Sequence, residues 1–429
     1  MVCRKLILFL ACAFSAAALA QPLPEEGVHP HEGVASCATS VCHGKVSPDP
    51  ESTVWLNEYR VWLRQDYHSR AYRTLQTAQS KAIAAKLGLP AAHTADICLD
   101  CHADNVANES RGRRFQISDG VGCEACHGGA GKWLESHAEE GTSHKDNLAA
   151  GMYPTEQPLA RAQLCLSCHL GTRDKFATHA IMGAGHPRLS FELETFTANQ
   201  PAHYEVDTDY AERKPAIGPV NMWLAGLAVS SLEYLHLLQS DLYTGSGLMP
   251  ELSFYQCHAC HHPMDDLRWQ PEFDSSALQP GAVRLNDGNL QVLITVLQSL
   301  GRSEATSVYG NLASLHKASL IDKKSVADSA AALVDALEPV LSIVTEEKYS
   351  SETQRLLRRD LLQAAKAGNY RHFTSAEQVF MAVETLSIAL DEEEMYRSQL
   401  DALFTSVENE NSFVPKQFAV LSGKMLGQL

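Results

Sequence analysis

The sequence is poor in positive charge. It has 35 Lys and Arg residues against 51 Asp and Glu residues, which gives a formal net charge of -16 at pH 7. A nucleic-acid-binding role therefore has no electrostatic support. Partners that are steered by charge would have to present basic faces to this chain.

Long apolar runs are also scarce. Beyond the first twenty residues, no segment reaches the roughly 18 consecutive apolar residues of a transmembrane helix. The first twenty residues have the signal-peptide pattern of Arg4 and Lys5, an apolar stretch over 6–18 and the small-x-small sequence Ala18-Leu19-Ala20. We predict a signal peptide over 1–20 and export to the periplasm or cell surface of a bacterium. An uncleaved anchor is the alternative, which the shortness of the apolar stretch disfavours.

Cysteine is absent after Cys260 and is clustered before it. Apart from two cysteines in the predicted signal peptide, the cysteines form five close pairs, and each pair is followed directly by a histidine. The pairs are Cys37 and Cys42, Cys98 and Cys101, Cys123 and Cys126, Cys165 and Cys168, and Cys257 and Cys260. The histidines that follow them are His43, His102, His127, His169 and His261.

Four of these motifs read Cys-x-x-Cys-His, which is the attachment signature of c-type haem. The two thiols add to the two vinyl groups of one porphyrin, and the histidine becomes the proximal ligand of the iron. The first motif has four residues between Cys37 and Cys42, a longer loop that can still reach both vinyl groups. We therefore predict five haem c groups.

Cysteine pairs also occur in disulfides, redox dithiols and zinc sites. None of these sites requires a histidine after every second cysteine. A disulfide stays open as the alternative for Cys37 and Cys42.

Strand signals are nearly absent, so we predict a mainly α protein with little β structure. Residues 21–35 are rich in Pro and Gly and are predicted as a flexible leader. Residues 36–275 are predicted as a pentahaem cytochrome c domain, with helices within 53–87 and over 220–239. So few residues per cofactor cannot build an ordinary core, and we expect the porphyrins to form most of it.

Residues 284–429 are predicted as a C-terminal helical bundle that binds no haem. Ser325 and Ser351 are the predicted N-caps, and His316 and His372 are predicted as surface histidines. Helical apolar periods recur at 290–300, 326–344, 354–365, 376–390 and 396–404.

The chain resembles the multihaem c-type cytochromes related to the tetrahaem cytochrome c of nitrifying bacteria, over roughly 36–270. The matching features are Ser36-Cys37 with Cys42-His43-Gly44, Trp62 with Asp66-x-His68-x-x-Ala71-Tyr72, Gly120-Val121-Gly122-Cys123-Glu124-x-Cys126-His127-Gly128, Ala184-Gly185-His186-Pro187-Arg188-Leu189-Ser190-Phe191-Glu192, and Pro250-Glu251-Leu252. The longer loop at Cys37 and Cys42, the fifth haem motif and the C-terminal bundle depart from the tetrahaem pattern.

This resemblance implies that His68 and His137 are distal haem ligands. Because five irons each need a second axial ligand or an open site, we extend the distal set to His179, His186 and His203. All three follow the fourth attachment motif in the chain.

The predicted function is electron transfer along five covalently bound haems, because ligation by two histidines closes the iron to substrate. The alternative is a multihaem redox enzyme with one open haem site that acts on a small nitrogen compound, which leaves an enzymatic role undecided. The nitrite-reductase motif Cys-x-x-Cys-Lys does not occur. Redox proteins are the expected partners, and the bundle could serve self-assembly or docking in a larger complex.

Overall fold

The computed structural model describes residues 22–50, 52–261, 278 and 282–429. The predicted signal peptide at 1–20 lies outside the described residues, as do residues 262–275 at the end of the predicted haem domain. The division of the chain into domains therefore stays a prediction.

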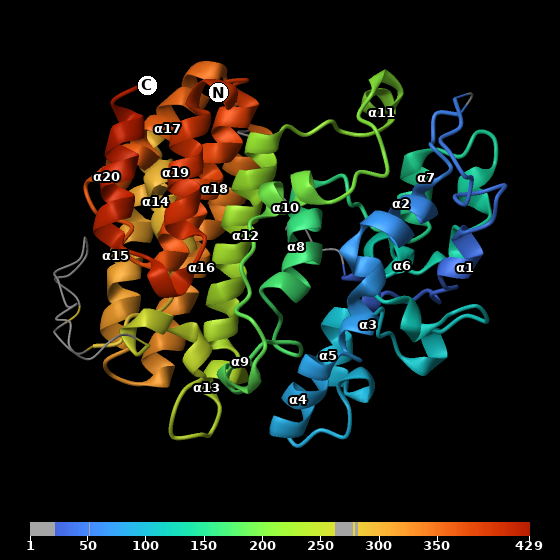
Figure 1. Ribbon diagram of the computed structural model, residues 1–429, viewed down its shortest axis with the longest axis horizontal. Helices are drawn as coiled ribbons and strands as arrows, with labels where there is room; N and C mark the ends of the chain where they lie inside the picture. Colours follow the sequence, from blue (N-terminus) through green and yellow to red (C-terminus); the bar gives the residue numbers. More distant parts are fainter. Residues whose placement is uncertain (1–21, 51, 262–277, 279–281) are drawn as a thin grey trace, which may run out of the picture.

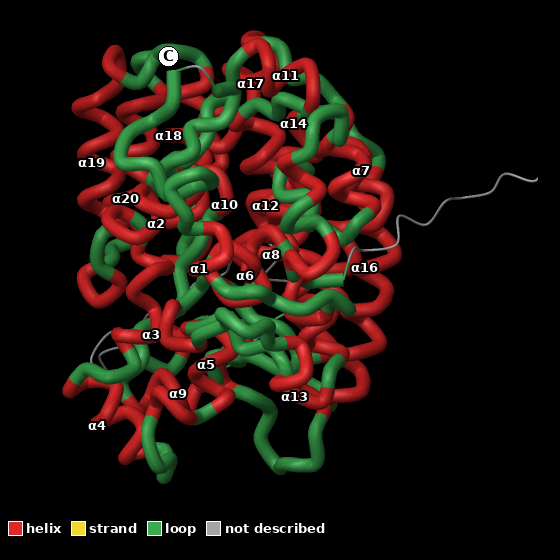
Figure 2. The backbone as a smooth tube through the Cα atoms, turned by 90° about the vertical axis from the view of Figure 1, so that its right-hand side faces the viewer, coloured by secondary structure: helices red, strands yellow, loops and turns green. Residues whose placement is uncertain are grey.

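The structure is 62% helical with almost no strands. In the described residues, β pairing is limited to two isolated bridges, between His31 and Arg111 and between Tyr255 and Leu285. Figure 2 accordingly shows helices and loops throughout. The prediction of a mainly α protein is confirmed.

The first half of the chain consists of short helices joined by long loops, and it forms the blue to green part of Figure 1. Its α-helices are α1 (Val34–Cys37), α2 (Glu58–Gln65), α3 (Ala71–Thr74), α4 (Ala78–Lys86), α5 (Asp96–His102), α6 (Cys123–His127), α7 (His144–Ala149), α8 (Pro158–His169), α9 (His179–Ala184), α10 (Leu193–Asn199) and α11 (Thr208–Arg213). Short 3-10 turns lie between them, including η2 (Tyr67–Arg70), η5 (Ile117–Asp119) and η7 (Ser136–Ala138).

The second half is a bundle of longer helices that pack side by side (Figure 1). They are α12 (Pro219–Gln239), α13 (Asp241–Thr244), α14 (Gly288–Ser299), α15 (Glu304–Ala318), α16 (Lys323–Glu346), α17 (Ser351–Lys366), α18 (Phe373–Ala389), α19 (Arg397–Val407) and α20 (Pro415–Leu426). One apolar core runs through the bundle from Val220 to Met425.

Helix α12 belongs to two cores at once. Trp223 and Leu227 pack into the bundle, whereas Met222 and Val229 pack with Leu166 of α8. Since α8 carries the fourth attachment motif, α12 connects the bundle core to the haem region. It is apolar on nearly all sides, as expected for a helix buried between two layers.

The predicted helices of the bundle are present, but α15, which contains Gly310, and α20, which begins at Pro415, were not predicted. The predicted N-caps were displaced: Asp322 caps α16 and Ser350 caps α17. The prediction of a surface position for His316 was wrong.

His316 is fully buried, and its Nε2 lies 3.0 Å from a carboxylate oxygen of Asp287, which is also buried.

The predicted leader contacts the folded part of the chain. His31 is almost fully buried, and its ring lies 2.8 Å from the carboxylate of Asp104. The carboxylate of Glu124 accepts hydrogen bonds from the backbone N–H groups of Glu32 and Gly33. These contacts hold the segment against α6. Among the described residues, no helix has the length and apolar character needed to cross a bilayer.

Candidate haem-binding sites

Three of the five attachment motifs lie within α-helices. Cys98, Cys101 and His102 lie on α5, and the third and fourth motifs lie on α6 and at the end of α8. Residues at i, i+3 and i+4 share one face of a helix, so a helical Cys-x-x-Cys-His motif presents two sulfur atoms and one imidazole to the same side. This is the arrangement that attachment and proximal ligation require of the chain.

The first motif reaches a similar arrangement by a different path. Helix α1 ends at Cys37, and a tight turn follows in which the N–H of Cys42 donates to the carbonyl of Thr39 at 3.0 Å. The N–H of His43 then donates back to the carbonyl of Cys37 at 3.2 Å. The turn accommodates the two extra residues that this motif has between its cysteines. None of the ten described cysteines forms a disulfide.

The structure brings each predicted distal histidine opposite a different proximal histidine. The ring pairs are His43 with His137 (centroids 6.0 Å apart, planes at 11°), His68 with His169 (6.2 Å, 89°), His102 with His186 (6.4 Å, 88°), His127 with His203 (6.2 Å, 89°) and His179 with His261 (6.1 Å, 32°). All ten histidines singled out in the sequence are used, and each is used once.

These separations leave room for a metal ion between the rings. Two metal–nitrogen bonds of about 2 Å, together with the two imidazole rings, span roughly 6 Å from centroid to centroid. The described residues contain no cluster of three or more His, Cys, Asp or Glu side chains that could hold a metal ion. A pair of facing imidazoles could hold the iron of a haem, whose porphyrin would supply the remaining ligands. The residues present fit haem.

Five of the ten paired histidines are oriented by a hydrogen bond from Nδ1 to a fixed acceptor, which leaves Nε2 for a metal. His102, His137 and His186 donate to backbone carbonyls: those of Ala71 at 3.2 Å, Trp133 at 3.0 Å and Pro187 at 2.8 Å, respectively.

Two histidines donate to carboxylates instead. His43 Nδ1 lies 2.9 Å from Glu58 Oε2, and His68 Nδ1 lies 2.9 Å from Asp66 Oδ1. Burial alone would raise the pKa of Asp66, but hydrogen bonds from His68 and Gln200 hold it at about 2. Burial also opposes the ionisation of Glu58, yet the hydrogen bond from His43 keeps its pKa below the ordinary value. Both carboxylates are therefore ionised at neutral pH.

Neither carboxylate was predicted from the sequence as a partner of a histidine. The signal for Asp66 was present in the sequence, because it precedes His68 by two residues and caps η2. Glu58 lies fifteen residues from His43, and nothing in the local sequence joins the two.

Other paired histidines lie in apolar surroundings. Burial lowers the pKa of His127 to about 3 and that of His169 to about 4. Phe191 stacks on His169 with ring centroids 4.5 Å apart. Both imidazoles therefore stay neutral at physiological pH, and a neutral imidazole has the lone pair that binds a metal.

Neighbouring attachment motifs touch one another. The thiols of Cys37 and Cys123 lie close enough for each to shift the pKa of the other, and so do those of Cys101 and Cys168. Cys168 Sγ also lies 3.8 Å from the carbonyl oxygen of Asp100 in the second motif. The first motif thus lies beside the third, and the second lies beside the fourth. Sites far apart in the sequence are adjacent in space.

The fifth motif lies against the bundle. The N–H of Gln256, next to Cys257, donates to the carbonyl of Arg284 at 2.9 Å. The backbone N–H of His179, on α9, donates to the carboxylate of Glu251 at 2.7 Å. The site is therefore assembled from the bundle on one side and α9 on the other.

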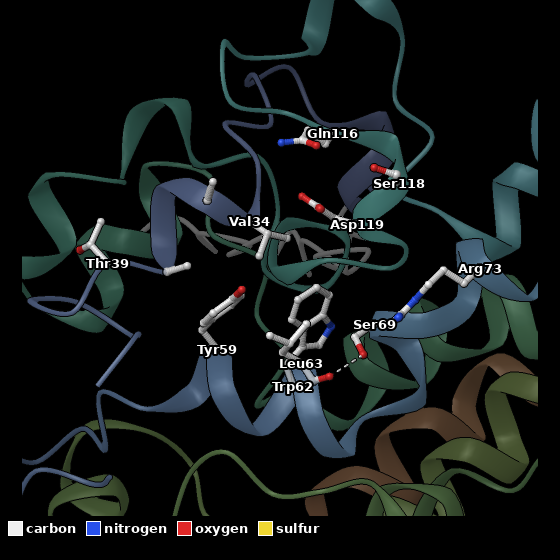
Figure 3. Close-up of a pocket in the computed structure, with 12 residues that line it drawn as sticks. Val34, Thr39, Tyr59, Trp62, Leu63, Ser69, Arg73, Gln116, Ser118 and Asp119 are labelled. Atoms are coloured by element: carbon white, nitrogen blue, oxygen red, sulfur yellow. Dashed lines mark hydrogen bonds between the residues drawn. The ribbon is translucent and has the colours of Figure 1, made fainter. Parts of the chain in front are cut away.

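A cavity of about 490 Å³ lies between α1, α2 and η5 (Figure 3). Val34 of α1 and Trp62 and Leu63 of α2 form apolar walls, and Arg73 and Asp119 add charge. The cavity contains none of the paired histidines, and it adjoins the helix that carries Cys37.

Comparison with known proteins gives one family. Residues 35–128 match the family described as cytochrome c554 and c-prime. The matched segment contains the first three attachment motifs, and the match supports a c-type cytochrome with covalently bound haem and a haem-based electron-transfer role. No match was found among curated proteins or among solved structures.

Proposed function

We propose that this chain is an exported electron-transfer protein with five covalently attached haem c groups, each ligated by two histidines. The observation that carries the proposal is the set of five ring pairs, because each pair joins an attachment-motif histidine to a histidine from elsewhere in the chain. Haem iron supplies reversible one-electron chemistry when it is bound. The relation to the tetrahaem cytochromes of nitrifying bacteria is part of this proposal.

The residues of the chain have three tasks in this function. The ten cysteines fix the cofactors, and the ten histidines close both axial positions so that substrates do not reach the iron. Hydrogen bonds such as that from His137 to the carbonyl of Trp133 hold the rings in place. The excess of acidic residues favours redox partners with basic docking faces.

The same pairing weighs against an enzyme that acts on a small nitrogen compound. Such an enzyme needs a proximal histidine without a partner, and each of the five has one. Electron carriage is therefore the function that the arrangement supports best.

The test combines mass with spin state. Denatured mature protein should exceed its apoprotein mass by five haems, and electron paramagnetic resonance of the oxidised protein should show low-spin ferric iron. Cyanide should change the spectrum little. A mass increase of four haems would remove Cys37 and Cys42 from the set, and a high-spin iron that binds cyanide readily would favour the enzyme.

A further inference from the structure

The paired histidines differ in the charge of the group that accepts the hydrogen bond from their Nδ1 atom. His43 and His68 donate to carboxylates at 2.9 Å. The acceptors of His102, His137 and His186 are neutral backbone carbonyls. The two carboxylates act on different sites, because His43 faces His137 and His68 faces His169.

Both carboxylates are held in place by further contacts. Asp66 Oδ1 also accepts the N–H of His68 at 2.9 Å, and Oδ2 accepts the side-chain amide of Gln200 at 2.9 Å. Its side chain is only 7% exposed. Glu58 is 14% exposed, and its second oxygen accepts the N–H of Leu56 at 2.9 Å. Neither group can turn away from its histidine without losing these bonds.

A carboxylate acceptor changes the imidazole that donates to it. It draws the N–H proton toward itself, and the ring becomes a stronger electron donor to a metal at the other nitrogen. It also places a negative charge close to the metal. Both effects favour the oxidised form of the iron, which carries more positive charge. A backbone carbonyl has a weaker effect because it has no net charge.

We propose that Glu58 and Asp66 set redox potentials. They lower the reduction potentials of the His43–His137 and His68–His169 positions relative to the His102–His186 position, where both rings donate to neutral carbonyls. This inference rests on the proposed axial ligation. Neither residue touches the iron, and each acts through the histidine that it orients.

The test removes the charge and keeps the shape. In Glu58→Gln and in Asp66→Asn, the amide oxygen can still accept the hydrogen bond. A spectroscopic redox titration should show one of five components moving to higher potential in each variant and two components in the double variant. The ratio of reduced to oxidised iron at a fixed potential should rise about tenfold, which for one electron is about 59 mV.

A matched control is available in Glu156→Gln. The carboxylate of Glu156 is 5% exposed and lies 3.0 Å from His144, which faces no proximal histidine. This control should leave all five components nearly in place. The inference is overturned if the two test variants move no component further than the control does. It is also overturned if they lose the low-spin signal without a shift.

The two proposals fail in different ways. Haem number and spin state in the unmodified protein test axial ligation before any variant is made. If these are as expected and neither variant shifts a component, only the roles of Glu58 and Asp66 are refuted. Because the two carboxylates act at separate sites, one variant still decides if the other does not fold.

Discussion

His68 lies opposite His169, but it belongs to no attachment motif. Replacing His68 therefore tests whether it binds an iron without affecting the covalent attachment of the haems. We expect His68→Ala to retain all five haems, because thioether formation does not use this side chain. One iron should lose an axial ligand, which would give one high-spin signal and a higher potential for that haem. Mass spectrometry and electron paramagnetic resonance measure the two effects.

His93→Ala is the control for this variant. His93 packs against Tyr72 at 6.3 Å and faces no proximal histidine, so its removal should leave the iron signals unchanged. An unaltered spectrum in His68→Ala would show that His68 is not a ligand.

Asp287 is the centre of a buried charge network in the bundle. It is 1% exposed, and its carboxylate accepts hydrogen bonds from Arg284 at 3.1 and 2.5 Å and lies 3.0 Å from His316 Nε2. Asp287→Asn removes the buried carboxylate that pairs with Arg284 and with His316. We expect the free energy of unfolding to fall by about 3–5 kcal/mol. Denaturant unfolding followed by circular dichroism measures this change.

The same network predicts a pH dependence. Burial alone would raise the pKa of Asp287, but Arg284 and His316 hold it well below its ordinary value of 3.8. Stability from a depressed carboxylate pKa is fully present above the ordinary pKa and is lost as pH falls through the folded-state pKa. Asp287→Asn should lack this loss below about pH 4. Asp328→Asn, which removes an exposed pair with Lys324, should change stability little and keep the acid dependence.

At the residue scale, the sequence could single out the ten histidines whose rings face one another, but not how they pair. The attachment motifs are local, and the number of irons limited the number of distal histidines. The pairing of His68 with the fourth motif depends on how loops cross in space. The partnership of Glu58 with His43 depends on the turn of α2, which no local pattern specifies.

At the scale of the element, α12 and α10 approach each other closely at Gly226. A Cβ atom at this position would lie 2.5 Å from Cβ of Leu193, so Gly226→Ala must push α10 away. We expect a loss of about 1–3 kcal/mol from overpacking. Gly310 is on the exposed side of α15, and a Cβ there would meet nothing within 4 Å.

Gly310→Ala should therefore stabilise by about 0.5–1 kcal/mol through helix propensity alone. The two substitutions are chemically the same and should have opposite signs in denaturant unfolding. Equal signs would contradict the close packing of α10 on α12.

Helix prediction succeeded where apolar residues recur strongly, as over 220–239 and 326–344. It failed at α15 and α20, whose helical state depends on packing as well as on the local sequence. The role of α12 was also not predictable, because periodicity identifies a buried helix and not the layers that bury it.

At the scale of the whole molecule, apolar side chains are distributed unevenly. The bundle has one continuous core, whereas the haem region has small clusters such as that of Leu75, Ala84, Ala92, Leu99 and Ala103. A region with so small a core cannot offset its conformational entropy without its cofactors. Chain produced without haem attachment should therefore keep a folded bundle and lose the fold before α12.

Limited proteolysis with mass spectrometry tests this expectation. Without haem, cleavage should spread over 22–213 and leave a resistant fragment that begins near α12, while the holoprotein should resist throughout. Equal susceptibility of the two halves would show that the bundle depends on the cofactors as well.

The angles between paired rings have a consequence of their own. Three pairs cross at 88–89°, whereas His43 and His137 are nearly parallel at 11°. Crossed imidazole planes leave the two π-symmetry d orbitals of an iron nearly equal in energy, and parallel planes split them. Ferric iron in the crossed pairs should then be strongly anisotropic magnetically, and iron between His43 and His137 should be rhombic. Chemically identical cofactors would thus fall into classes that differ in the orientation of their ligands: three crossed pairs, one nearly parallel pair and one pair at 32°.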